Sequence, residues 1–304
     1  MNAKPRDRAG PNRRGVLERF PAPVLFLASG CTQYYGAALA VGLFAVLPAA
    51  SVAWWRLAVS ASILIAWRRP WRQPWTAREL GASAVFGIVL ASMNVAFYLA
   101  IAHLPLGTAV AIEFLGPVAV AGVTGRGWRD RLGIALAAAG VVLLAGVQLQ
   151  GGLTRDVVVG LVAIICSAAA WAGYILLGRR IAVQRDGISA LAVGMTAGAL
   201  VYSPLAIGAV TPVVGDPRRL LAVLGIAVLS SVIPYAIEQL VLRRVTAARF
   251  AILLALLPVT AAITGAVLLG QVPTAGEVIG MVLVCAGIVL SAQRAVGPDN
   301  PLPA

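Results

Sequence analysis

Long apolar runs, separated by short polar turns, occupy almost the whole chain. An α-helix needs about 17 to 25 mostly apolar residues to cross a bilayer. Turn-forming residues such as Pro48, Pro105, Gly151 and Pro273 fall between the runs, so the two signals agree. The pattern predicts an all-α integral membrane protein with ten transmembrane helices, at residues 22–42, 48–67, 80–101, 106–124, 132–149, 157–178, 187–210, 220–242, 250–269 and 275–293.

The two halves of the chain resemble each other. PVAVAGVTG at 117–125 aligns with PVTAAITGA at 258–266, and AAGVVLLAG at 138–146 aligns with CAGIVLSAQ at 285–293. Because each half has an odd number of spans, the second half must enter the membrane from the opposite side, and two such copies predict alternating access. The predicted organisation is a basic cytoplasmic tail, two inverted five-helix repeats and a second cytoplasmic tail, at residues 1–21, 22–150, 157–293 and 294–304.

The composition excludes a water-soluble fold. The chain has 304 residues, of which 60% are hydrophobic and 12% are charged, and its mean hydropathy is +0.92. A soluble domain carries about 25% charged residues. The predicted partner of this surface is therefore a lipid bilayer.

The net charge of +13 could suggest a nucleic-acid partner, but the positions of the 24 basic residues argue against one. If the N-terminal tail is cytoplasmic, twenty of them fall in cytoplasmic segments and Arg56 lies inside a span. Only Arg155, Arg218 and Arg219 lie outside. Cytoplasmic connections of membrane proteins collect Lys and Arg, so this distribution predicts a multi-pass protein with both termini in the cytoplasm and no nucleic-acid partner.

Glu113 stands near the middle of the fourth apolar run, four residues before Pro117. A charged side chain at that depth costs about 2.5–3.5 kcal/mol or more, so Glu113 must face protein or a water-filled cavity. Pro117 offers no N–H to the Glu113 carbonyl and predicts a helix break, and Pro258 predicts the same break in the second half. Paired breaks in inverted repeats are typical of a transporter's central site, and we expect Glu113 to couple transport to protons. The alternative is a structural kink with a buried, protonated Glu113.

Glu238 is the other carboxylate that lies away from the span ends, and it shares a helical face with Ser231 and Tyr235. It is the second candidate for proton coupling. An ion pair with Arg243 or Arg244 explains its presence equally well.

Arg56 and several polar stripes are the candidate substrate-binding residues. The Arg56 guanidinium could capture the carboxylate of a small-molecule substrate, or extend to the membrane interface. Polar residues at helical spacing could line a cavity or hydrogen-bond between helices; they are Ser29 with Gln33, Asn94 with Tyr98, and Ser167 with Trp171 and Tyr174. From these stripes and the face of Glu238, the predicted substrate-binding residues are Gln33, Arg56, Asn94, Tyr98, Trp171 and Tyr235.

Other chemistry has little support in the sequence. The single histidine, His103, lies at a span end, and no intramembrane Ser/His pair is present, so we do not expect an enzyme. No metal site and no cofactor are predicted, because no pairing or ligand spacing links Cys31, Cys166 and Cys285. Two small-residue motifs predict close helix packing, with a homodimer face as the alternative; they are Gly194-xxx-Gly198 and Gly276-xxx-Gly280.

Three segments resemble the threonine and homoserine exporter family, which belongs to the EamA branch of the drug/metabolite transporter superfamily. They are WRLAVSASILIAWRRPWR at 55–72, SMNVAFYLAIAHLPLGTAVAIEFLGPVAVA at 92–121 and SSVIPYAIEQLVLRRV at 230–245, and the likeness extends from about residue 22 to 293. The resemblance implies a bacterial inner-membrane exporter of small amino acids or related metabolites that is driven by the proton gradient. The positions that match the family are Arg56, Asn94, Tyr98, Glu113, Pro117, Tyr235 and Glu238.

One position departs from the family pattern. Relatives usually carry an acidic residue just before the second-half proline, and this chain has Leu257 there. If that acid carries protons in the relatives, this chain must use Glu113 or Glu238, or couple differently. The alternative functions are export of other metabolites or drugs, a lipid flippase subunit and a membrane enzyme that acts on lipids.

Overall fold

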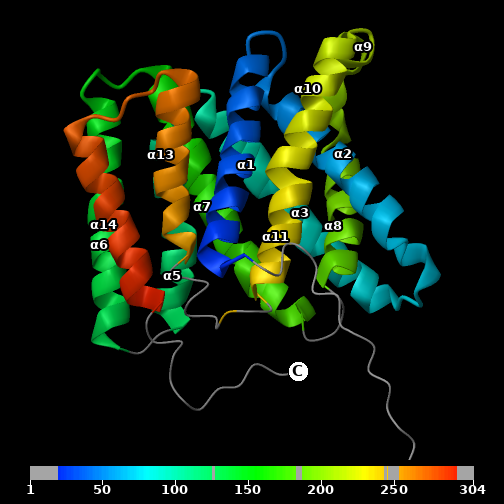
Figure 1. The fold of residues 1–304 in the computed structure, drawn as a ribbon, viewed down its shortest axis with the longest axis horizontal. Coiled ribbons are helices and arrows are strands. Elements are labelled where there is room, and N and C mark those ends of the chain that lie inside the picture. The colour runs from blue at the N-terminus through cyan, green and yellow to red at the C-terminus, as the bar shows by residue number, and fades with distance from the viewer. Residues whose placement is uncertain (1–19, 125–126, 183–186, 243–244, 246–252, 293–304) are drawn as a thin grey trace, which may run out of the picture.

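The computed structural model describes residues 20–124, 127–182, 187–242, 245 and 253–292. Within these residues the regular elements are all helical (Figure 1). The first half contains α1 (Ala22–Leu43), α2 (Ala49–Arg68), the short turn η2 (Pro70–Arg72), α3 (Ala77–Ile101), α4 (Leu106–Glu113), α5 (Leu115–Thr124) and α6 (Trp128–Leu149). The second half contains α7 (Arg155–Ala182), α8 (Gly187–Val201), η3 (Ser203–Ala206), α9 (Val210–Val214), α10 (Pro217–Ala227), η4 (Val228–Val232), α11 (Ile233–Leu242), α13 (Leu256–Leu269) and α14 (Ala275–Ala292).

These helices confirm a multi-pass helical membrane protein. Seven helical stretches of the described chain are long and apolar enough to cross a membrane, counting α4 with α5 and α10 with its continuation. Three shorter apolar helices, at Gly187–Val201, Leu256–Leu269 and Ala275–Ser291, fall in the remaining predicted runs. The total of ten spans and the inverted repeat stay predictions.

The seventh predicted span, 187–210, is longer than the helix that the structure contains. α8 ends at Val201, and the chain continues as the short turn η3 before α9 begins at Val210. Pro204 explains the difference, because its ring clashes with the backbone carbonyl four residues earlier and it has no N–H to continue the helical hydrogen bonds. Hydropathy alone does not register this stop.

Helices of the two halves pack mainly against each other. α6 packs against α14 and α2 packs against α8, and these pairs form the two edges of the molecule in Figure 1. Between them, α1 contacts α10, α11 and α13, while α7 contacts α3, α4 and α5. The centre of the protein is therefore built from both halves.

Glycines allow α3 to approach α8 closely, and α6 to approach α14. A Cβ atom on Gly87 of α3 would collide with the backbone of Gly194 in α8, and one on Gly198 would lie 2.7 Å from the Gly87 carbonyl. In α14, a Cβ on Gly280 would lie 3.1 Å from the Gly140 carbonyl of α6. Both predicted glycine motifs are thus used inside the chain, as small residues are at close membrane-helix crossings. The alternative, a homodimer face, draws no support from them.

Three helix irregularities lie near the centre. α4 ends at Glu113 and α5 begins at Leu115, so Phe114 separates the two helices, three residues before Pro117. In the second half, Ala255 separates α13 from the two helical residues before it. Ala255 precedes Pro258 by as many residues as Phe114 precedes Pro117. The third irregularity is the widened π-helical turn η4, and such turns are frequent at functional sites.

Candidate functional site

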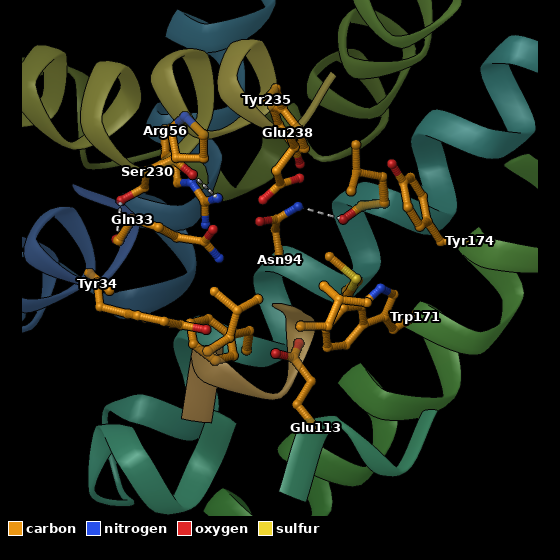
Figure 2. Close-up of a pocket in the computed structure, with 17 residues that line it drawn as sticks. Gln33, Tyr34, Arg56, Asn94, Glu113, Trp171, Tyr174, Ser230, Tyr235 and Glu238 are labelled. Atoms are coloured by element: carbon orange, nitrogen blue, oxygen red, sulfur yellow. Dashed lines mark hydrogen bonds between the residues drawn. The ribbon is translucent and has the colours of Figure 1, made fainter. Parts of the chain in front are cut away.

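A polar cavity of about 120 Å³ lies where these irregularities meet. Figure 2 shows that its labelled side chains converge from several helices of both halves. The residues predicted from sequence that line it are Gln33, Arg56, Asn94, Glu113, Trp171, Tyr235 and Glu238. Its other lining residues are Tyr34, Ala37, Leu90, Met93, Phe97, Tyr174, Ser230, Pro234, Leu254 and Leu257.

Arg56 of α2 is held on one wall of the cavity by the π-helical turn. Its Nε donates to Ser231 Oγ at 2.9 Å, and its Nη2 donates to the Ser230 carbonyl at 2.8 Å. That carbonyl is available to a side chain because Pro234, four residues later, has no N–H to donate to it. Only 8% of Arg56 is exposed, and no ion pair joins it to a carboxylate within the described residues. Its remaining N–H groups are therefore free for an anion in the cavity.

Tyr98 supports Arg56 and does not line the cavity. Its ring lies under the guanidinium, with the Arg56 Cζ 5.4 Å from the ring centroid. The residue is fully buried, and it packs against Phe44 and Phe97. A cation over an aromatic face is stabilised by the ring quadrupole, so Tyr98 helps to hold the charge from behind.

Glu113 ends α4 and reaches the cavity from its opposite side (Figure 2). It is 8% exposed, and its Oε1 lies 2.5 Å from Ser167 Oγ of α7. The same hydroxyl lies 3.0 Å from the carbonyl oxygen of Met93 in α3. Glu113 therefore has one hydrogen-bond partner among the described residues, and that partner has a second acceptor.

Glu238 of α11 lines the cavity beside Tyr235 (Figure 2). Within the described part of the chain, no hydrogen bond or ion pair satisfies its carboxylate. The predicted ion pair with Arg243 or Arg244 concerns residues that lie outside the described ones. Glu238 thus presents an acceptor to the cavity.

The neutral polar residues complete the wall. Asn94 donates its Nδ2 to the Leu90 carbonyl at 2.7 Å, which leaves its amide oxygen for the cavity. The Gln33 backbone carbonyl accepts from Ser230 Oγ at 3.1 Å, while its side chain faces inward (Figure 2). Trp171 packs edge-on against Phe114 at 4.7 Å between ring centroids, so the helix break also positions this indole.

Several residues that line the cavity were not predicted as site residues from the sequence. Tyr34 and Ser230 are two of them, and both lie next to residues that the polar stripes had singled out. The buried Leu257 also lines the cavity, so the position where relatives carry an acid faces the site and is apolar here. One arginine and two carboxylates are the charged side chains that the described structure brings to this cavity.

Known proteins resemble this chain in sequence and in fold. Residues 158–293 match the EamA-like transporter family. A solved structure, described only as "Crystal structure of protein", shares the fold with a TM-score of 0.58. It is 20% identical and covers 91% of this chain and 99% of its own.

Curated relatives cover almost the full length. The threonine/homoserine exporter RhtA of Salmonella typhimurium strain SL1344 is 34% identical over 90% of this chain and 92% of the relative. RhtA of Escherichia coli K12 is 32% identical over 86% of this chain and 88% of the relative. The chain therefore belongs to the family of the threonine/homoserine exporter RhtA, within the EamA-like transporters.

Proposed function

We propose that the protein exports small amino acids of the threonine and homoserine type across the bacterial inner membrane, in exchange for protons and by alternating access. The observation that carries the proposal is the central cavity, in which Arg56 and two carboxylates face a common space without pairing with each other. The relatives named above are exporters of threonine and homoserine, and this supports the class of cargo.

Arg56 is suited to the carboxylate of the cargo. The guanidinium is planar and carries its donors in a fork that matches a carboxylate. Two of its donors are already fixed by Ser230 and Ser231, so the remaining ones are oriented before the cargo arrives. Binding then loses little side-chain entropy.

Glu238 is suited to the amino group of the cargo. Its carboxylate has no partner among the described residues, and aromatic side chains of Tyr235, Trp171 and Tyr174 line the same cavity. A carboxylate together with aromatic faces favours an ammonium group. An α-amino acid would thus satisfy the charges of Arg56 and Glu238 at the same time.

Glu113 then remains as the proton carrier. It lies across the cavity from Arg56 and holds a hydrogen bond to Ser167, so it does not need the cargo for a partner. Because an ionised carboxylate in an apolar span is costly, Glu113 can exchange a proton when the cavity opens to water. With Leu257 in place of the family acid, Glu113 and Glu238 are the carboxylates that face the cavity in the described chain.

The cavity volume favours small cargo over the drug alternative. Sites for drug-sized ligands occupy about 300–1,000 Å³. The cavity measures about 120 Å³, which is enough for about four water molecules at about 30 Å³ each. A short amino acid suits this space, and a multi-ring drug does not.

Amino-acid tolerance of cells tests this function. Cells that overexpress the chain should tolerate higher concentrations of threonine or homoserine than cells with an empty vector, and Glu238→Gln should remove that advantage at equal membrane levels. Equal tolerance of vector and wild-type cells to every small amino acid would contradict the proposal. Tolerance to multi-ring drugs alone would favour the alternative.

A further inference from the structure

Ser167 of α7 occupies an unusual position between two acceptors. Its Oγ lies 2.5 Å from Glu113 Oε1 and 3.0 Å from the Met93 carbonyl oxygen, and the residue is fully buried. A serine hydroxyl carries one proton. It can therefore donate a full hydrogen bond to Glu113 or to Met93, but not to both.

The protonation state of Glu113 decides which acceptor receives this proton. When Glu113 is ionised, Ser167 must donate to the carboxylate, since a hydrogen bond to a charged acceptor is the stronger one. When Glu113 is protonated, its own O–H can donate to Ser167 Oγ, and the serine proton can turn to the Met93 carbonyl. No covalent bond changes at Ser167, because the transported proton stays on Glu113 and the hydroxyl only rotates.

The Met93 carbonyl belongs to the wall that α3 gives to the cavity. Met93 and Asn94 are consecutive in α3, and both line the cavity. The carbonyl lies inside the helix and has a second lone pair for Ser167. The hydrogen bond from Ser167 of α7 to the Met93 carbonyl of α3 is thus complete only when Glu113 is protonated.

From this geometry we infer that Ser167 is a switch that passes the protonation state of Glu113 to α3, and so to the wall that carries Asn94. The inference rests on the proposed proton-coupled export. Ser167 acts through Glu113 and is therefore a positioning residue.

The surroundings leave this role to Ser167. The charged and titratable groups that share the cavity with Glu113 are Tyr34 of α1, Arg56 of α2, Tyr174 of α7, and Tyr235 and Glu238 of α11. Within the described residues, none of them hydrogen-bonds to Glu113. α3 and α13 contribute no titratable side chain to the described lining.

The test compares Ser167→Ala with Ser167→Thr, which keeps the hydroxyl. Each variant is reconstituted in liposomes, and threonine transport is measured across a range of pH, both as gradient-driven uptake and as exchange. Ser51→Ala is the matched control, because buried Ser51 also donates to a carbonyl of another segment, that of Leu205 at 2.7 Å, and no carboxylate is involved.

We expect Ser167→Ala to lower gradient-driven transport about fivefold, the factor that one net hydrogen bond represents, and to leave exchange within about twofold. Its pH profile should differ from that of the wild type, whereas Ser167→Thr and Ser51→Ala should keep the wild-type profile. In infrared difference spectra, the carboxyl band that Glu113→Gln removes should change position in Ser167→Ala.

Three results would overturn the inference. If the wild type depends on the pH gradient and Ser167→Ala has the same pH profile and the same carboxyl band, the switch is wrong and proton coupling stands. If the wild type ignores the gradient, the proposed coupling fails and the switch fails with it. If Ser167→Ala does not fold, the infrared spectra of Ser167→Thr and the wild type can still be compared. A displaced carboxyl band in Ser167→Thr without a changed pH profile contradicts the switch.

Discussion

Arg56 lies inside an apolar helix bundle, and no opposite charge among the described residues is in contact with it. The cost of burying its charge is offset by two hydrogen bonds that Arg56 donates to the turn η4 and by the ring of Tyr98 behind it. We propose that an Arg held in this way is a preformed anion site, since its unused donors have no other described partner. This arrangement predicts a clear difference between arginine and lysine at the position.

Arg56→Lys should insert normally but transport threonine at least about tenfold less efficiently. Lysine keeps the charge, but it lacks the planar fork and cannot donate to Ser230 and Ser231 while also holding a carboxylate. Rates of export per amount of protein in the membrane check this. If Arg56→Ala transports as well as the wild type, Arg56 does not bind the cargo and only joins α2 to η4.

The sequence identified most of the charged and polar cavity residues, because a membrane span has few reasons to keep them. Tyr98 shows the limit of this reasoning. It is one turn from Asn94 and was expected on the same cavity wall, but Arg56 fills the space in front of its ring. Tyr34 shows the opposite error. It lines the cavity, but it was not predicted to do so, because the helical spacing of Ser29 and Gln33 indicated a face that does not include it. Helical spacing gives the face of a helix, whereas the neighbouring helix decides which part of that face remains open.

The helix breaks are the elements that the sequence predicted best. Proline removes one N–H wherever it occurs inside a helix, so the interruptions at Phe114 and Ala255 follow from local chemistry. The same chemistry acts at the π-helical turn η4 (Val228–Val232), because Pro234 has no N–H for the Ser230 carbonyl, although no helix irregularity was predicted there. The freed Ser230 carbonyl accepts a hydrogen bond from Arg56, which is more than 170 positions away in the sequence and could not be identified as its partner from local chemistry.

The crossing of α3 and α8 should tolerate no side chain at Gly194. A Cβ there would lie 2.7 Å from the Ser83 carbonyl oxygen and 3.0 Å from the Gly87 Cα. Gly194→Leu should therefore separate the two helices and lower stability by about 1–3 kcal/mol or more. Thermal unfolding of the purified protein in detergent measures this.

Gly42→Leu is the control for that substitution. Gly42 belongs to α1, and a Cβ on it would meet no atom within 4 Å. Its unfolding temperature should stay at or above that of the wild type, because leucine is also the better helix former. An equal loss of stability in both variants would mean that the close crossing is not the cause.

At the scale of the whole molecule, the basic residues distinguish the two ends of the bundle. The connection between α2 and α3, with Arg68, Arg69 and Arg72, lies at the lower end in Figure 1. The start of α10, with Arg218 and Arg219, lies at the upper end. We predict that the lower end is cytoplasmic.

Reporter fusions check this orientation. A fluorescent protein fused after Ala304 should fluoresce, because it folds in the cytoplasm, and alkaline phosphatase inserted at Gly151 should be active outside. An active phosphatase fused after Ala304 would contradict the predicted topology and, with it, the inverted repeat.

The pairing of helices from the two halves could not be read from the sequence. Internal similarity indicates two copies, but it does not say that α1 lies against α10, α11 and α13, or that α7 lies against α3. These contacts place Arg56 of one half against η4 of the other, and Glu113 against Ser167. A change at Arg56 or at Glu113 therefore acts on the interface between the halves, which is the surface that must rearrange in alternating access.

Proton-driven transport by Glu113 can be measured in liposomes with an acidic interior. We expect the wild type to accumulate threonine inside against its gradient until a protonophore removes the pH difference. Glu113→Gln keeps the shape of the side chain but cannot titrate, so it should exchange threonine without accumulating it. Accumulation by Glu113→Gln at the wild-type rate, or wild-type transport that ignores the pH difference, would contradict a proton-coupled exporter that works through Glu113.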